Sequence, residues 1–159
     1  LACRGALAQA IDWGAMPVNH VIRPDHRLVY IRAFGTLTGD EFIAIHHRVY
    51  NDPMRENDFS HLWDTRRIET LSMGPEVIGQ YREVVGQYGD RMGNARVAVV
   101  ANRELTEMLS RMFIALREEG SRQKHRLCQD LASAAKWLQV PKSELDAIDS
   151  PDPGPEFSI

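Results

Sequence analysis

The polar run Asp64–Arg67 (DTRR) contains the residue types in this chain that are best suited to bind a ligand. It directly follows the apolar pair Leu62-Trp63, and Asn102-Arg103 follows a second apolar run, Ala95–Ala101, in the same way. Open α/β sheets bind ligands at the carboxyl ends of their strands, where two guanidinium groups can hold an anion through paired hydrogen bonds. We therefore predict one ligand- or partner-binding edge. It comprises Asp64, Thr65, Arg66, Asn102 and Arg103.

A second interpretation of the same run is structural. Asp64 can accept hydrogen bonds from nearby backbone amides and pair with one arginine while the other arginine is solvated, an arrangement that contributes little to stability at a surface. The sequence leaves both interpretations open. An enzyme that uses Asp64, Arg66, Asn102 and Arg103 is a further alternative, although no nucleophile–base pair accompanies these residues in the sequence.

Other residues that often carry chemistry lack the spacing that it requires. His46 and His47 are adjacent, so on a helix they point about 100° apart and cannot bind one metal ion from a single face. His61 and His125 fall on separate predicted strands, and Cys128 lies in a short strand without a basic neighbour that would activate it. No nucleophile elbow or phosphate-binding glycine loop is present. We expect no catalytic residue, no metal site and no cofactor.

Length and composition indicate one globular domain. The 159 residues suit a single domain, and a net charge of −3 with both signs mixed offers no basic stripe for nucleic acid. No apolar run approaches the roughly 20 residues of a membrane span. Cys3 and Cys128 lie far apart, outside any CxxC motif, which indicates free thiols in a reducing compartment, the cytoplasm.

Five segments read as strands. Val18–Ile22 and Arg27–Phe34 are separated by the turn residues Pro24-Asp25-His26, so we predict a hairpin whose first strand is the sheet edge. Three further runs are apolar or β-favouring. They are Phe59–Asp64, Ala95–Ala101 and Lys124–Cys128.

Capping residues and apolar stripes predict four helices between these strands. Thr38 and Glu41 form a capping box before a helix that ends near Asn51. The second helix follows Ser72, with Pro75 in its first turn. Asn102 caps the third and Asp130 the fourth, which ends at Pro141. Ser143–Ile148 adds one more turn, and the run Pro151–Pro155 is a loose tail.

The resulting order is β-β-α-β-α-β-α-β-α, an α/β fold with a mostly parallel sheet and an antiparallel N-terminal edge strand. We expect residues 1–17 to be an N-terminal extension, residues 18–140 to be the domain, and residues 141–159 to be a short helix and a loose tail.

Three stretches carry a resemblance to a known family. They are His20–Thr38 (HVIRPDHRLVYIRAFGTLT), Phe59–Arg67 (FSHLWDTRR), and Ala95–Gly120 followed by Arg126–Val140. Together they resemble the SpoIIAA-like group, relatives of the STAS domain of anti-sigma-factor antagonists, with a fold akin to the CRAL-TRIO lipid-binding domain. The resemblance implies a small β/α superhelix that works through contacts with proteins or small ligands. It does not imply an enzyme.

The resemblance also points to Ser72. Members of the family carry a phosphorylated serine at the start of the second helix, within an Asp-Ser-Ser-Gly-type loop. The matching stretch here, Thr70–Gly74 (TLSMG), keeps one serine and the glycine but lacks the aspartate. Ser72 is thus a possible phosphosite, because a helix N-terminus favours a phosphate, and alternatively an ordinary capping or loop hydroxyl.

These observations lead to a functional hypothesis. We expect a non-catalytic, STAS-like regulatory or protein-interaction module of a bacterium that binds a regulatory protein, with a homodimer as one possible assembly. The alternative is a carrier of a small apolar or amphipathic ligand, since Met108, Met112 and Phe113 lie together on the third predicted helix. The same stripe is also what a helix needs to pack on a sheet.

Overall fold

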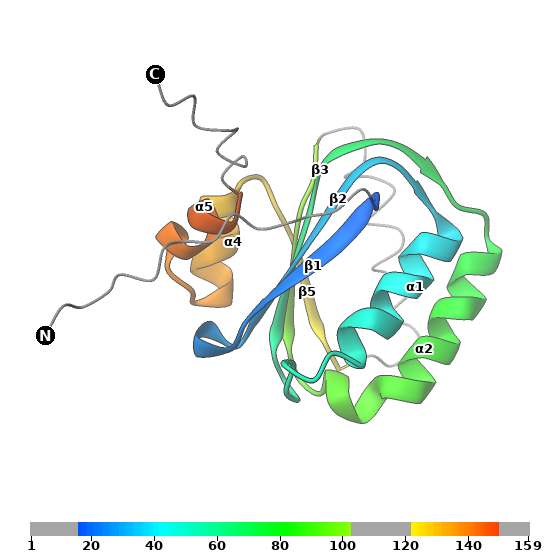
Figure 1. The fold of residues 1–159 in the computed structure, drawn as a ribbon, viewed down its shortest axis with the longest axis horizontal. Coiled ribbons are helices and arrows are strands. Elements are labelled where there is room, and N and C mark those ends of the chain that lie inside the picture. The colour runs from blue at the N-terminus through cyan, green and yellow to red at the C-terminus, as the bar shows by residue number, and fades with distance from the viewer. Residues whose placement is uncertain (1–15, 103–121, 150–159) are drawn as a thin grey trace, which may run out of the picture.

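The computed structural model describes residues 16–102 and 122–149. Its centre is a five-stranded sheet in the order β1-β2-β3-β4-β5 (Figure 1). Strand β1 pairs antiparallel with β2, and all other neighbours pair in parallel. The predicted α/β fold with an antiparallel N-terminal edge strand is confirmed. The strands are β1 Val18–Arg23, β2 Leu28–Thr38, β3 Ser60–Ser72, β4 Arg96–Val100 and β5 Lys124–Cys128.

Helices cover both faces of this sheet. The first two, α1 Gly39–Tyr50 and α2 Glu76–Met92, lie on one face, because right-handed crossovers between parallel strands taken in sequential order fall on the same side (Figure 1). The last two, α4 Leu131–Leu138 and α5 Lys142–Asp149, follow the final strand and lie on the opposite face. The third predicted helix lies outside the described residues.

Local capping signals set where helices begin. The Thr38 hydroxyl accepts a hydrogen bond from the Glu41 amide at 3.2 Å, and the Glu41 carboxylate accepts one from the Thr38 amide at 3.2 Å. Asp130 accepts a hydrogen bond from the Ser133 amide at 2.7 Å and begins α4. Both predicted caps are confirmed, since each satisfies a backbone donor that the first turn leaves without a partner.

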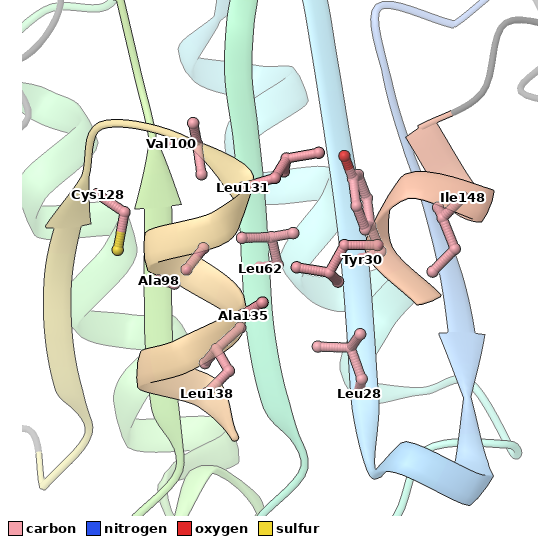
Figure 2. Packing of buried hydrophobic residues seen from close by; sticks show 12 residues of the cluster. Leu28, Tyr30, Leu62, Ala98, Val100, Cys128, Leu131, Ala135, Leu138 and Ile148 are labelled. Carbon is pink, nitrogen blue, oxygen red and sulfur yellow. The ribbon is translucent and has the colours of Figure 1, made fainter. Parts of the chain in front are cut away.

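Alternation along the strands divides the core into two layers. Side chains such as those of Leu28, Tyr30 and Leu62 face α4 and α5, and Figure 2 shows them packed against Leu131, Ala135 and Leu138. Their neighbours in sequence face the other way, toward α1 and α2. That second layer includes Val29, Ile31, Trp63, Val97 and Val99 with Ile45 and Val49. A strand buried on both faces needs apolar residues at nearly every position, as these strands have.

Strand β3 does not end at Asp64, and the prediction that it ends there is wrong. The strand continues to Ser72 and pairs with β2 along its whole length, because β2 itself extends to Thr38. Buried Leu37 and Ile68 give this two-stranded extension an apolar face against the helices. The neighbouring strand β4 does end opposite Asp64, whose register partner is its last residue, Val100.

Helix α5 is more than an added turn beyond the domain. Leu145 and Ile148 are fully buried in the same core layer as Leu28 and Tyr30. Helix α5 therefore contributes to the packed core. None of the helices in the described part of the chain has the length and hydropathy that crossing a bilayer requires.

Candidate functional site

Asp64 is the centre of a buried hydrogen-bond cluster. Its Oδ2 accepts from the Tyr30 hydroxyl at 2.8 Å, from Arg66 Nη2 at 2.8 Å and from Arg67 Nη1 at 3.2 Å. Its Oδ1 accepts from Arg66 Nε at 2.9 Å and from the Arg66 amide at 3.2 Å. The side chain is fully buried, so every charge-stabilising contact comes from the protein itself.

An irregularity in β3 brings two consecutive arginines to one carboxylate. Arg32 of β2 is the register partner of Asp64, but the next paired positions are Phe34 and Arg67, so β3 carries one residue more than β2 in this interval. Such a bulge interrupts the alternation of side chains and re-aims them. Without it, Arg66 and Arg67 would point to opposite faces of the sheet.

The cluster fixes the protonation states of its members. Burial raises the pKa of the Asp64 carboxyl, but hydrogen bonds from Arg66 and Tyr30 outweigh burial and hold it below its ordinary value. Burial and then the charge of Asp64 raise the pKa of Tyr30 far above its ordinary value. Asp64 is therefore ionised and Tyr30 protonated near neutral pH, and neither group is tuned to exchange a proton there.

A second carboxylate reaches the same arginines from helix α5. Oδ1 of Asp149 lies 2.9 Å from Arg66 Nη2 and accepts from Arg67 Nη2 at 3.0 Å. Arg32 lies beside the cluster as the register partner of Asp64 on β2, and burial and then the positive charge of Arg67 lower its pKa. Counted over the described residues, three guanidinium groups thus lie at a site with two carboxylates, Asp64 and Asp149, which leaves one positive charge in excess. We call Arg32, Arg66, Arg67 and Asp149 the arginine edge.

The structure brings together only part of the edge predicted from sequence. Asp64 and Arg66 are in direct contact. Thr65 is buried, and its hydroxyl donates to the Val100 carbonyl at 2.9 Å, so it supports the end of β4. The Asn102 side chain donates to the Ile68 carbonyl at 3.4 Å. Arg103 lies outside the described residues.

Four residues at this site were not among the predicted site residues, namely Tyr30, Arg32, Asp149 and Arg67, the last of which belongs to the run that suggested the site. Tyr30 and Arg32 are two positions apart on β2, so strand alternation places both on the face of Asp64 once the pairing of β2 with β3 is known. Asp149 has no comparable local signal. It reaches the site because α5 returns across this face of the sheet.

Ser72 lies away from this cluster. It is exposed, ends β3 and is the register partner of Thr38. Helix α2 begins at Glu76 with Pro75 as its N-cap, so the interpretation of Ser72 as the helix cap is wrong. The Glu76 carboxylate lies so close to Gly74 that a Cβ there would collide with it. A carboxylate in front of this helix N-terminus disfavours a phosphate at the same place.

His46 and His61 are buried, and burial lowers the pKa of both. Nδ1 of His46 lies 2.7 Å from the Phe42 carbonyl, and burial lowers the pKa of His46 to about 4. Arg55 Nε donates to His61 Nε2 at 3.3 Å, which requires that nitrogen to be unprotonated. Among the described residues, no three histidine, cysteine or acidic side chains form a group that could hold a metal ion. Met108, Met112 and Phe113 lie outside the described residues.

A comparison with solved structures identifies the fold. The chain is similar to the crystal structure of an uncharacterized protein of the DUF3478 family from Shewanella loihica PV-4, which has a SpoIIAA-like fold. The TM-score is 0.51 at 16% identity, and the match covers 76% of this chain and 91% of that chain. No protein-family model and no curated protein sequence matches the chain. The predicted SpoIIAA-like fold is confirmed, and at this identity the similarity extends to the fold alone.

Proposed function

We propose that this chain is a non-catalytic, STAS-like interaction module of the bacterial cytoplasm, which binds a regulatory protein through the arginine edge. The SpoIIAA-like fold of a structural neighbour supports the type of module. The free thiol of Cys128 supports a reducing compartment.

The proposal depends on one observation, namely the burial and the hydrogen bonding of the Asp64 carboxylate. A general base must hold a pKa near the working pH and keep a lone pair directed at its substrate. Asp64 is fully buried, its pKa is lowered, and both oxygens already accept hydrogen bonds from Tyr30, Arg66 and Arg67. The carboxylate of Asp64 therefore holds Arg66 and Arg67 in place.

The outward side of the cluster offers a recognition surface. Arg66 is 32% exposed and Arg67 is 42% exposed, while the carboxylate that orients both is fully buried. Arginine guanidinium groups recognise carboxylates and phosphates with defined geometry, and arginine is enriched where protein interfaces gain most of their binding energy. An oriented and partly exposed arginine pair suits an acidic partner.

Affinity capture from an extract of the source organism tests this proposal. The bait is used as wild type, as Arg67→Gln, and as Arg126→Gln, an exposed arginine on β5 that serves as the matched control. Arg67→Gln leaves Asp64 paired with Arg66 and Tyr30, so the fold is retained. We expect a protein retained by wild type and Arg126→Gln and depleted at least tenfold, about 1.4 kcal/mol, with Arg67→Gln.

Two outcomes would contradict the proposal. Equal retention by all three baits would show that the arginine edge does not contact the partner. Conversion of a small molecule by the purified wild-type chain, retained by Arg126→Gln and lost in a folded Arg67→Gln variant, would identify an enzyme.

A further inference from the structure

We infer that Arg66 and Arg67 form an oxyanion-binding site that Asp149 occupies as an internal ligand, and that a carboxylate or phosphate group on the partner polypeptide displaces Asp149 on binding. This inference rests on the proposed function and names the group that the arginine edge recognises. It also makes Asp149 a built-in competitor that lowers the affinity for the partner.

The first support is the rigidity of the site. Arg66 is held by two parallel hydrogen bonds to buried Asp64, through Nε at 2.9 Å and Nη2 at 2.8 Å. Arg67 is held to the same carboxylate through Nη1 at 3.2 Å. Two guanidinium groups fixed in this way lose little conformational entropy when an anion binds, because the ordering has already occurred on folding.

The second support is the set of donors that remain. Within the described residues, Nη1 of Arg66 and Nε of Arg67 donate no hydrogen bond, although both guanidinium groups are partly exposed. Each of the two groups also directs one Nη2 toward Asp149. An incoming oxyanion can therefore accept hydrogen bonds from both arginines. The donor groups available to it outnumber the two Nη2 groups that Asp149 Oδ1 contacts.

The third support is that an incoming anion can reach Asp149. Within the described residues only its Oδ1 contacts the arginines, and its side chain keeps 20% exposure on the side where the arginines are also partly exposed. Asp149 is also the last residue of α5, at the negative end of the helix dipole, which disfavours a carboxylate. Leaving the arginines requires rotation of this side chain alone, because Leu145 and Ile148 keep the helix docked.

The geometry of the donors selects the ligand class. Two planar guanidinium groups bind an anion that carries two or three oxygens on one central atom, namely a carboxylate or a phosphate monoester. Asp149 is itself an example of the first kind. Because Arg32 adds a third positive charge to the cluster, a doubly charged phosphate gains more than a singly charged carboxylate.

Side-chain NMR of the whole chain tests the inference, with the Nε–Hε signals of Arg66 and Arg67 followed during titration with inorganic phosphate and, separately, with acetate. We expect Asp149→Asn to lower the Kd for at least one anion about tenfold relative to wild type. Asp146→Asn is the matched control, since it removes the same charge from the same helix at a position paired with Lys142. Adding Arg67→Gln to Asp149→Asn should abolish the gain.

A larger gain for phosphate identifies a phosphorylated partner, and a larger gain for acetate identifies an acidic one. The inference is overturned if Asp149→Asn binds both anions as weakly as Asp146→Asn does, or if the gain survives Arg67→Gln. Thermal melts of each variant, with Asp149→Ala as a second replacement, show whether the fold is intact. If Arg67→Gln still loses the captured partner while Asp149→Asn gains nothing, the proposed function stands and only the inference fails.

Discussion

At the scale of single residues, the buried charge of Asp64 organises the site. A carboxylate removed from water is tolerated only when other groups replace its hydration, and here Tyr30, Arg66 and Arg67 supply the hydrogen bonds. The same contacts orient the two arginines outward. Stability and recognition at this site therefore depend on one side chain.

Replacing that side chain should destabilise the fold. Asp64→Asn keeps the shape but removes the negative charge and one of the two acceptor oxygens that the guanidinium groups and the Tyr30 hydroxyl share. We expect a loss of about 3 kcal/mol in the free energy of unfolding, measured by urea denaturation. Asp146→Asn removes a charge from a half-exposed ion pair and should change it by less than about 1 kcal/mol. Equal stability of the two variants would show that the buried pairs contribute nothing.

A second residue-scale prediction concerns pH. The pKa of His46 is about 4 in the folded chain and about 6.5 in the unfolded chain, so below pH 6.5 the unfolded state binds the proton first. The stability is complete above pH 6.5 and falls as the pH drops to 4, by roughly 3 kcal/mol. Burial lowers the pKa of His61 as well, which adds a loss of the same sign.

Urea denaturation at pH 7 and pH 5 measures this effect. His46→Gln should show a smaller loss between the two values than wild type does. His26, a partly exposed histidine beside Glu144, supplies the matched control as His26→Gln. A wild-type stability that does not change between pH 7 and pH 5 would mean that His46 is not kept neutral by burial.

At the scale of the elements, local signals fixed where helices begin, whereas long-range pairing fixed the length of β3. The capping residues Thr38 and Asp130 lie next to the turns they satisfy, so they are readable from sequence. Residues 65–67 are polar and resemble a loop, and only the matching extension of β2 makes them part of a strand. Gly35 adopts a positive φ within β2, beside a second register shift, but it lies just after the strand predicted from the sequence and was not used as a signal of irregular pairing.

The same distinction applies to the site. Asp64 and Arg66 are two residues apart, and pairing of Asp64 with one arginine was one of the two interpretations of the run, whereas in the structure both arginines contact it. Asp149 lies 82 positions from Arg67 in sequence, and its contact depends on how α5 crosses the sheet. Thr65 looked like part of the edge because it lies between them, yet its hydroxyl bonds the backbone of β4.

Helix α5 provides the prediction at this scale. Its Leu145 is fully buried against the sheet, so Leu145→Ala should leave a cavity and cost about 2–5 kcal/mol in the free energy of unfolding. Met54→Ala, at an exposed apolar position, is the control and should cost less than about 0.5 kcal/mol. A Leu145→Ala variant as stable as the Met54→Ala variant, in thermal or urea melts, would show that α5 is not part of the core.

At the scale of the whole molecule, the two faces of the sheet carry different elements. Among the described elements, helices α1 and α2 lie on one side of the sheet, and the helices after the last strand lie on the other (Figure 1). Helix α5 is tied to this second face near both of its ends, by Glu144 with Arg23 at 3.0 Å and by Asp149 with Arg67 at 3.0 Å. The arginine edge thus forms where the C-terminal helix meets the extended pair β2–β3.

The central claim is that this edge binds a partner protein, and calorimetric titration of the captured partner tests it most directly. The account predicts that Arg67→Gln raises the Kd at least tenfold while Arg126→Gln leaves it unchanged, with both variants as folded as wild type. A Kd for Arg67→Gln equal to that of wild type would contradict the account.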